Sequence, residues 1–136
     1  MKIVIAVIIY DRLTNLIEWI RCWKMCETEG AELVIIHNYK SVQEKDIFYL
    51  YCEKEGIKCF SRPNIGMDIG AFQDVCYGRI EKFPEWEYLL WCTDDVLPMS
   101  RSFLSPYINK IKNSPEILEV FFIQQKFFQY YIKMKL

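Results

Sequence analysis

Residues 3–9 have the sequence Ile3-Val4-Ile5-Ala6-Val7-Ile8-Ile9, an unbroken apolar run in which every residue except Ala6 is β-branched. Asp11 and Arg12 end it, so the run is far shorter than the roughly 20 apolar residues of a membrane span. A short strand that is apolar on both faces is typical of the centre of a parallel sheet covered by helices. The run therefore predicts an α/β fold without a membrane span.

Extended and helical patterns alternate along the rest of the chain. Apolar runs predict further strands at residues 33–36, 57–60, 88–92 and 117–123. Between them, helices are expected to begin at Asn15, at Ser41, after Gly70 and at Ser105. This alternating order predicts an α/β, Rossmann-like parallel sheet with helices on both faces, joined by right-handed crossovers.

The first two helices are expected to begin with a capping box, in which a small polar residue precedes a glutamate by three positions. Asn15 precedes Glu18 in this way, and Ser41 precedes Glu44. The inward face of the second helix is expected to consist of Ile47, Leu50 and Tyr51.

The composition limits the class of protein. A chain of 136 residues that is 52% hydrophobic is expected to form one globular domain. Its net charge of -1 argues against nucleic acid as a partner, because such proteins usually carry a basic excess. The six cysteines include no Cys-x-x-Cys pair and the chain has one histidine. This argues against a structural zinc site and favours reduced thiols in a cytoplasmic protein.

Polar residues gather after four of the predicted strands. Ligands of open α/β sheets bind beyond the carboxyl ends of the strands, so these residues are candidates for a binding site. They are Tyr10, Asp11 and Arg12 after the first strand, His37 and Asn38 after the second, Arg62, Asn64 and Asp68 after the third, and Thr93, Asp94 and Asp95 after the fourth.

The neighbouring acids Asp94 and Asp95 predict a divalent metal site. Adjacent carboxylates repel each other unless a cation keeps both of them ionised. Mg²⁺ and Mn²⁺ prefer oxygen ligands and bridge a carboxylate to a diphosphate. One aspartate is therefore expected to meet the metal and the other a sugar hydroxyl.

The loop from Asn64 to Gly70 has the pattern Asn-x-Gly-x-Asp-x-Gly. Gly66 and Gly70 permit positive φ or a close approach of the backbone to a ligand. The pattern is neither the dinucleotide-binding loop nor the Walker loop. Two interpretations stay open, namely a ligand-binding loop and a tight connection from strand to helix.

Taken together, the four strand ends resemble the nucleotide-sugar-binding half of GT-A-fold glycosyltransferases, most closely those of family two. Residues 62–71 are similar to that family's Asn-x-Gly loop, and residues 89–98 look like the strand that delivers its Asp-x-Asp motif. The resemblance covers residues 2–123. It divides the chain into a GT-A-like nucleotide-sugar-binding domain at 1–123 and an aromatic, basic tail at 124–136.

The resemblance implies that the chain transfers a sugar from a nucleotide-diphosphate donor to a glycan or lipid-linked acceptor. It implies Asp95 as the ligand of Mg²⁺ or Mn²⁺, and it places His37 where the family usually has the acid that binds the base. The residues implied to bind the nucleotide sugar are Tyr10, Asp11, His37, Asn38, Arg62, Asn64, Gly66, Asp68 and Asp94.

The acceptor-binding segment and the catalytic base of the family lie beyond this resemblance. No catalytic residue is therefore assigned, and the chain is expected to be a fragment or a reduced member. If residues 124–136 are helical, Phe128, Tyr131 and Ile132 lie together on one side. Such an apolar face predicts self-association, with peripheral contact to the inner face of a membrane as the alternative.

Two other classes stay open. The first is a non-catalytic module that binds a nucleotide sugar without an acceptor half. The second is a response-regulator-like or other flavodoxin-type domain, in which acids at strand ends bind Mg²⁺. That class would have an acid pair after the first strand and a lysine after the fifth, and neither is clear in this sequence.

Overall fold

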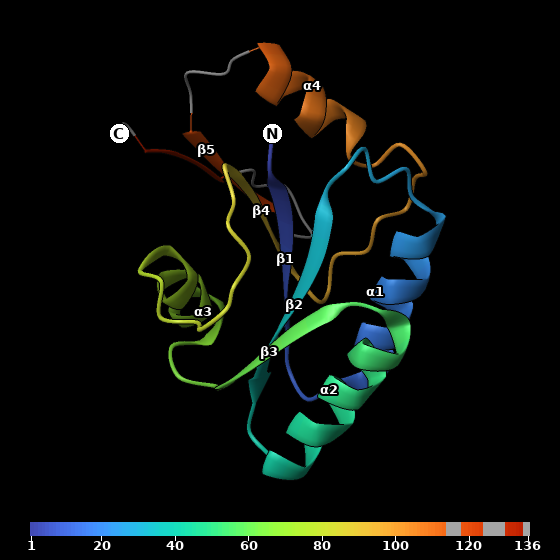
Figure 1. Ribbon diagram of the computed structural model, residues 1–136, viewed down its shortest axis with the longest axis vertical. Helices are drawn as coiled ribbons and strands as arrows, with labels where there is room; N and C mark the ends of the chain where they lie inside the picture. The colour runs from blue at the N-terminus through green and yellow to red at the C-terminus, as the bar shows by residue number, and fades with distance from the viewer. Residues whose placement is uncertain (114–117, 124–129, 135–136) are drawn as a thin grey trace.

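The computed structural model describes residues 1–113, 118–123 and 130–134. Its strands and helices alternate up to the last two strands (Figure 1). In chain order the elements are β1 (Ile3–Ile9), α1 (Leu13–Met25), β2 (Glu32–Tyr39), α2 (Val42–Glu55), β3 (Lys58–Pro63), α3 (Met67–Cys76), β4 (Tyr88–Thr93), α4 (Ser105–Asn113), β5 (Leu118–Ile123) and β6 (Tyr130–Met134).

The described strands form one sheet in the order β3-β2-β1-β4-β5-β6. The strands from β3 to β5 run parallel, and β6 pairs with β5 in the antiparallel direction. The chain builds outward from β1 in one direction and then continues with β4 on its other side, and ligands of such sheets bind at this change of direction. The predicted Rossmann-like α/β fold is confirmed.

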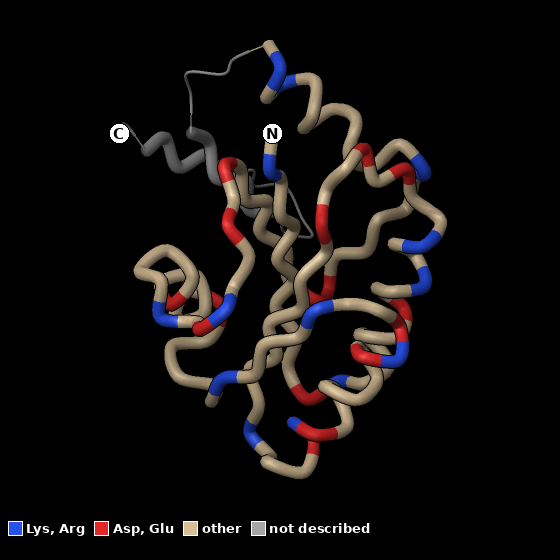
Figure 2. Tube along the Cα trace, in the orientation of Figure 1, with Lys and Arg blue, Asp and Glu red and all other residues tan. Residues whose placement is uncertain are grey.

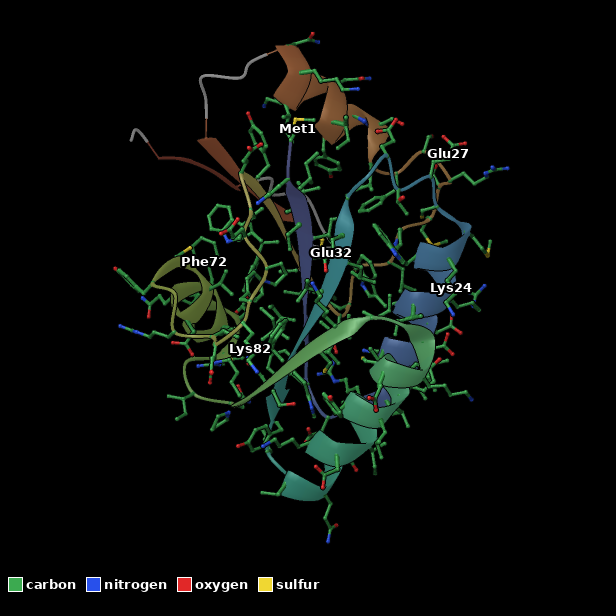
Figure 3. All side chains as sticks on the ribbon, in the orientation of Figure 1. Met1, Lys24, Glu27, Glu32, Phe72 and Lys82 are labelled. Carbon is green, nitrogen blue, oxygen red and sulfur yellow. The ribbon has the colours of Figure 1, made fainter. Side chains whose placement is uncertain are left out.

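Helices cover both faces of the sheet. Figure 3 shows Lys24 of α1 and Phe72 of α3 on opposite sides of it. The side chains of β1 alternate between the two layers, because successive residues of a strand point to opposite faces. Ile5 joins the core formed with α1, α2 and α4, whereas Ala6 joins the core formed with α3.

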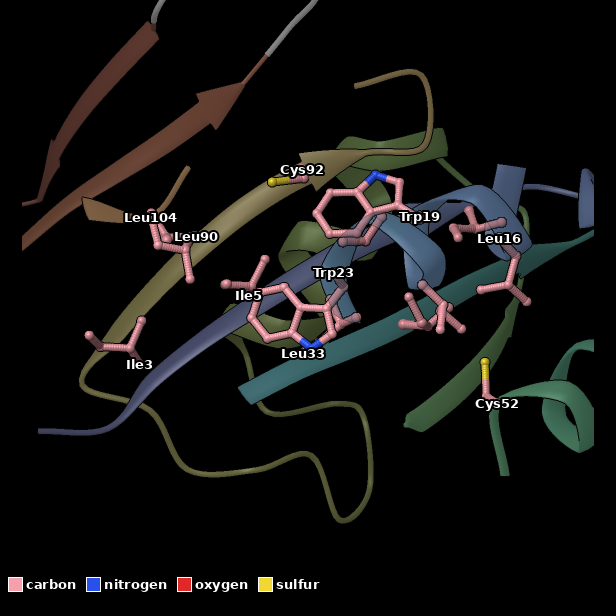
Figure 4. Packing of buried hydrophobic residues seen from close by; sticks show 14 of the residues in the cluster. Ile3, Ile5, Leu16, Trp19, Trp23, Leu33, Cys52, Leu90, Cys92 and Leu104 are labelled. Atoms are coloured by element: carbon pink, nitrogen blue, oxygen red, sulfur yellow. The ribbon is translucent and has the colours of Figure 1, made fainter. Parts of the chain in front are cut away.

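The larger core fixes the segment that follows β4. Trp19 and Trp23 of α1 are buried over the strands (Figure 4). The indole Nε1 of Trp19 donates a hydrogen bond of 2.6 Å to the carbonyl of Val96. Buried aromatic residues supply much of the packing energy of a core, so this contact holds the polar residues after β4 against the start of α1.

The starts of the first two helices differ from the predicted capping boxes. Helix α1 begins at Leu13 with Arg12 as its N-cap, so the prediction of Asn15 as the cap is wrong. Ser41 is the N-cap of α2, as predicted, but its side chain makes no capping hydrogen bond. The side chain of Asn15 is instead bonded to Asp94, and this tertiary contact replaces the local one.

One of the three residues predicted for the inward face of α2 packs against the core. Tyr51 is partly buried there, whereas Ile47 and Leu50 are 45% and 61% exposed, and the buried residues are Phe48 and Cys52. Apolar residues occur all around this helix, so the sequence does not single out one side. The packing against β2 and β3 makes that choice.

The end of the chain differs from the helix that the sequence allowed for residues 124–136. Tyr130–Met134 form β6, which is paired with β5, so a helix is wrong for these residues. Residues 124–129 and 135–136 lie outside the described residues. The boundary at residue 123 and self-association through the tail stay predictions.

Three further observations bear on the expectations from composition. All six cysteines are free. Figure 2 shows basic and acidic residues on the helices of both sides of the sheet, as expected from the net charge of -1. Within the described ranges, no helix is both long and apolar enough to cross a membrane.

Candidate functional site

The strand register brings the predicted residues to one edge of the sheet. Ile8 of β1 is level with Thr93 of β4, and Ile9 is level with His37 of β2. On the other side of β2, Asn38 is level with Arg62 of β3. The carboxyl ends of four parallel strands therefore meet at one edge. The predicted residues lie in these strands or in the segments that follow them, with Asp68 in the first turn of α3.

Two of these strands extend further than predicted. β2 continues to Tyr39 and β3 to Pro63, so His37, Asn38 and Arg62 lie within strands and not after them. His37 and Asn38 are fully buried. Polar side chains at such positions need partners inside the protein, and their hydrogen bonds determine what they can contribute to a site.

Asp94 is a buried acid at the junction of β4, β1 and α1. It is 4% exposed, and its Oδ2 accepts a hydrogen bond of 3.2 Å from Nδ2 of Asn15. It also accepts a hydrogen bond from the backbone N–H of Tyr10. Burial raises the pKa of Asp94 above its ordinary value, and the charge of Asp95 adds to this, whereas Asn15 and the charge of Arg12 act in the opposite direction.

Asp95 is exposed next to this buried acid. The hydroxyl of Thr93 donates a hydrogen bond to its Oδ1, which holds the carboxylate at the end of β4. An exposed carboxylate with a fixed orientation can take a cation on its remaining oxygen. Within the described residues, no group of three or more His, Cys, Asp or Glu side chains is arranged around a metal position.

Tyr10 connects Asp94 with the loop before α3. Its hydroxyl lies beside the side chain of Asn38 and accepts a hydrogen bond from the backbone N–H of Asp68. Burial raises the pKa of Tyr10, and the charges of Asp68 and Asp94 raise it further. The phenol therefore stays protonated beside two acids and can donate or accept a hydrogen bond.

Asp11 and His37 form a closed pair between β1, β2 and α2. Nε2 of His37 lies 2.7 Å from Oδ1 of Asp11, and Oδ2 of Asp11 accepts hydrogen bonds of 3.1 Å from the backbone of Lys40 and of Ser41. Burial opposes the charge of Asp11, but these hydrogen bonds lower its pKa below the ordinary value. Both carboxylate oxygens are occupied, so Asp11 holds the start of α2 in place.

His37 is neutral in this arrangement. Burial lowers its pKa, with the hydrogen bond to Asp11 acting in the opposite direction, and its ring lies 3.9 Å from the ring of Phe48. Because Asp11 accepts the hydrogen bond, Nε2 carries the proton. Nδ1 is buried without a hydrogen-bond partner among the described residues. The ring faces the core, so its assignment to base recognition stays a prediction.

Asn38 and Arg62 are joined to each other and to the loop before α3. Arg62 Nη1 donates to Oδ1 of Asn38 at 2.9 Å, and its Nη2 donates to the carbonyl of Ile65 at 2.9 Å. Its Nε donates to Oδ2 of Asp74 at 2.7 Å. Asn38 Nδ2 donates to the carbonyl of Met67 at 2.9 Å. These hydrogen bonds connect the side chains of Asn38, Arg62 and Asp74 with the carbonyls of Ile65 and Met67.

The two glycines of the loop have a local structural reason. Gly66 has a φ of 74° and is the N-cap of α3. A Cβ on Gly70 would lie 2.1 Å from the carbonyl oxygen of Ile65, which no side chain can tolerate. The interpretation as a tight strand-to-helix connection thus accounts for both glycines. Asn64 continues β3 with a backbone hydrogen bond to Tyr39, while its Oδ1 is buried without a partner among the described residues.

The sequence pattern does not identify Asn15 and Asp74 as parts of this edge. It favours Asn15 as a helix cap, and it gives Asp74 no role. One signal could have found Asn15, because the first turn of a helix that follows a central strand faces the ligand edge. No local signal marks Asp74, which lies in α3 and meets Arg62 only in the folded chain.

A separate cavity of about 620 Å³ lies at the opposite edge of the sheet. Its lining includes Lys2 before β1 and Phe83 and Trp86 before β4. It contains no residue predicted for the site. Ligands of open α/β sheets bind at the carboxyl ends of the strands, so this cavity does not compete with the candidate site.

Comparisons with known proteins support the fold. No family model and no curated protein matches the sequence. The structure is similar to the crystal structure of TarS from S. aureus, with a TM-score of 0.57 and 16% sequence identity over 86% of this chain. The chain spans 21% of the length of that protein. At this identity the similarity shows a shared fold alone.

Proposed function

We propose that this domain binds a nucleoside-diphosphate sugar at the carboxyl ends of β1 and β4 with the help of Mg²⁺ or Mn²⁺. The sugar would be transferred to a glycan or lipid-linked acceptor. The proposal takes its reaction class from two sources: the resemblance of the strand-end motifs to GT-A-fold enzymes, and the similar fold of TarS, a glycosyltransferase.

One observation carries the proposal, namely the acid cluster, which we define as Tyr10, Asp68, Asp94 and Asp95. The charges of Asp68 and Asp94 both raise the pKa of Tyr10, and the charge of Asp95 raises the pKa of Asp94. Among the residues that the structure describes, none of these three carboxylates has a cation within salt-bridge distance. Burial opposes the charge of Asp94, and groups whose pKa values are perturbed in this way gather at functional sites.

Asp95 fits the role of a metal ligand that acts together with the substrate. Mg²⁺ is usually held by one or two carboxylates, by water and by substrate phosphates, and it does not need a complete protein cage. An exposed carboxylate oriented by Thr93 meets this requirement. The metal would supply positive charge to the departing diphosphate.

Asp94, Tyr10 and Asp68 would bind the sugar or ribose part of the donor. Asp94 is held in one orientation by Asn15 and by the backbone of Tyr10, and a fixed carboxylate can accept hydrogen bonds from two neighbouring hydroxyls. The phenol of Tyr10 can donate a further hydrogen bond. This division assigns the metal to the exposed acid and the donor hydroxyls to the buried one.

The test is calorimetry with UDP and other nucleoside diphosphates, with and without Mn²⁺. We expect Mn²⁺ to tighten the binding of at least one nucleotide by tenfold or more, since metal-mediated contacts to a diphosphate are strong. Asp95→Asn should remove this gain. Glu81→Gln serves as a control, because it removes an exposed acid at the opposite edge of the sheet.

Equal affinity with and without Mn²⁺ in both the unchanged chain and Asp95→Asn would exclude the metal site. Failure of every nucleoside diphosphate to bind would exclude the proposed function altogether. Binding without sugar transfer to any acceptor would favour the non-catalytic module, which shares the donor site and differs only in turnover.

A further inference from the structure

Arg62 is the most completely bonded charged side chain at the site edge. All three of its guanidinium nitrogens donate a hydrogen bond of 2.7–2.9 Å, each to a different residue. The side chain is 12% exposed. A guanidinium binds a phosphate best with two parallel N–H groups, and here one N–H of each terminal nitrogen already donates to a protein oxygen.

The charge of Arg62 is also matched inside the protein. Asp74 accepts from Nε of Arg62 at 2.7 Å, and its other oxygen lies 3.4 Å from Nη1 of the exposed Arg79. A phosphate near Arg62 would meet this carboxylate as well as the guanidinium. The pair is therefore a poor anion site, although the resemblance implied a contact to the diphosphate.

The contacts of Arg62 converge on the loop before α3. The carbonyl of Ile65 accepts from Arg62, and the carbonyl of Met67 accepts from Asn38, which Arg62 also holds. The carbonyl of Ile65 lies so close to the backbone of Gly70 that a Cβ would not fit between them. A glycine at this position therefore permits the tight packing of the loop. Two carbonyls of one short loop are thus fixed from two neighbouring strands.

The start of α3 delivers part of the acid cluster. Asp68 is the second residue of α3, directly after Met67, and its backbone N–H donates to the hydroxyl of Tyr10. The side chain of Asn38 lies beside this hydroxyl too. Arg62 is therefore connected to Tyr10 indirectly. It donates to Asn38, and Asn38 donates to the carbonyl of Met67, the residue before Asp68.

We infer that Arg62 is a positioning residue, which holds the loop of residues 64–67 so that Asp68 lies against Tyr10, and that it does not contact the ligand. The inference deepens the proposed function, on which it rests for the role of Tyr10 and Asp68 as donor contacts. Its structural part, the fixing of the loop, can be measured without any ligand.

The experiment is amide hydrogen exchange followed by NMR on the full chain without ligand. The reporter is the amide of Gly70, which donates to the carbonyl of Gly66 at 2.8 Å. The reference is the amide of Ile35 at the centre of the sheet, whose exchange reports unfolding of the whole domain. Arg62→Met and Arg62→Lys are compared with Arg79→Met, which removes the exposed partner of the same Asp74.

We expect exchange at Gly70, relative to Ile35, to accelerate about tenfold or more in Arg62→Met, because the loss of hydrogen bonds to charged groups opens the loop locally. Arg62→Lys should behave like Arg62→Met, because lysine keeps the charge but cannot reach three acceptors at once. Arg79→Met should leave the ratio unchanged.

Unchanged exchange at Gly70 in Arg62→Met would overturn the inference, as would equal acceleration at Gly70 and Ile35. If Arg62→Met does not fold, Arg62→Lys and the double variant Arg62→Met/Asp74→Leu decide by the same ratio. Calorimetry with UDP separates the two proposals. Absence of UDP binding to the unchanged chain would refute the proposed function, while the exchange ratio would still decide the role of Arg62.

Discussion

The two sides of the ligand edge use polar residues in opposite ways. On the β3 side, Asp11, His37, Asn38 and Arg62 are bonded to one another or to the backbone, and we call these four residues the bonded cluster. On the β4 side, none of the carboxylates of the acid cluster has a cation within salt-bridge distance among the described residues. Polar residues at a strand end can thus form hydrogen bonds within the fold or remain available to a ligand.

The difference shows which residues of a motif to test for binding. A buried polar group whose hydrogen bonds are all made inside the protein stabilises the structure and has little left for a ligand. Like charges without an ion-pair partner repel one another, and an external cation can balance them. By this criterion, we propose the acid cluster as the ligand site and the bonded cluster as its frame.

The largest effect is expected on the side of the bonded cluster, from Gly70→Ala. Alanine normally stabilises a helix relative to glycine, but here its Cβ would overlap the carbonyl of Ile65. We expect a loss of about 2–3 kcal/mol in the free energy of unfolding, as for overpacked sites, measured by urea denaturation. Gly78→Ala is the control, because its Cβ would meet no atom within 4 Å and only its φ of 66° is unfavourable.

A loss at Gly78→Ala as large as that at Gly70→Ala would show that backbone conformation, and not the close approach to Ile65, explains the glycine. The steric explanation for Gly70 on the β3 side would then be wrong. A stabilised Gly70→Ala would contradict the geometry of the loop outright.

A smaller effect, of opposite sign on the two sides, is expected when either the partly exposed Asp11 or the buried Asp94 is neutralised. Asp11→Asn should destabilise the domain by about 1–2 kcal/mol, because hydrogen bonds to a charged acceptor are lost. Asp94→Asn should stabilise it by about 0.5–1 kcal/mol, as often happens when a functional group is removed. Urea denaturation at pH 7 measures the change in the free energy of unfolding for both variants. Changes of the same sign would contradict the proposed difference between the two clusters.

The smallest effect is the pH dependence of stability. The folded pKa of His37 lies below its ordinary value of 6.5, so the unfolded chain takes up a proton below about that pH while the folded chain does not. Stability should therefore fall as the pH drops below 6.5. The folded pKa of Asp94 lies above its ordinary value of 3.8, so stability should rise as the pH falls through that raised pKa.

Two variants separate these opposing contributions in a series of urea titrations between pH 8 and pH 4. His37→Phe should lose the decline below pH 6.5, and Asp94→Asn should lose the gain at lower pH. Asp11 has a lowered pKa, so its contribution persists to below 3.8 and does not interfere in this range. An unchanged profile in both variants would mean that neither group titrates differently in the folded state.

The fold could be predicted from sequence because the signals that specify it are local. The apolar run at residues 3–9, the glycine at 56 and the Ser105-Pro106 helix start each follow from short-range chemistry, and all three are found where expected. The strand ends could also be predicted, because the carboxyl ends of parallel strands lie at one edge. That rule assigns Tyr10, Asp94 and Asp95 to the candidate site from the sequence alone.

The roles of individual side chains could not be predicted in the same way. Asn15 has the sequence pattern of a helix cap, yet it bonds to Asp94, which is 79 residues away in sequence. Ile47 and Leu50 fit a helical apolar face, yet Phe48 and Cys52 are buried instead. In both cases the local pattern allowed two outcomes of similar energy, and a distant contact selected one of them.

The sequence by itself determined the order of strands and helices from β1 to β5 and the edge at which polar residues collect, because backbone preference and apolar periodicity act over a few residues. Only the tertiary structure decided that Arg62 and His37 form hydrogen bonds within the fold, while Asp94 and Asp95 have no cation within salt-bridge distance among the described residues. A hydrogen bond or an ion pair depends on which atoms lie within about 3 Å after folding. That distance is set by the packing of β1, β2, β3, β4, α1 and α3 as a whole, and no short segment contains it.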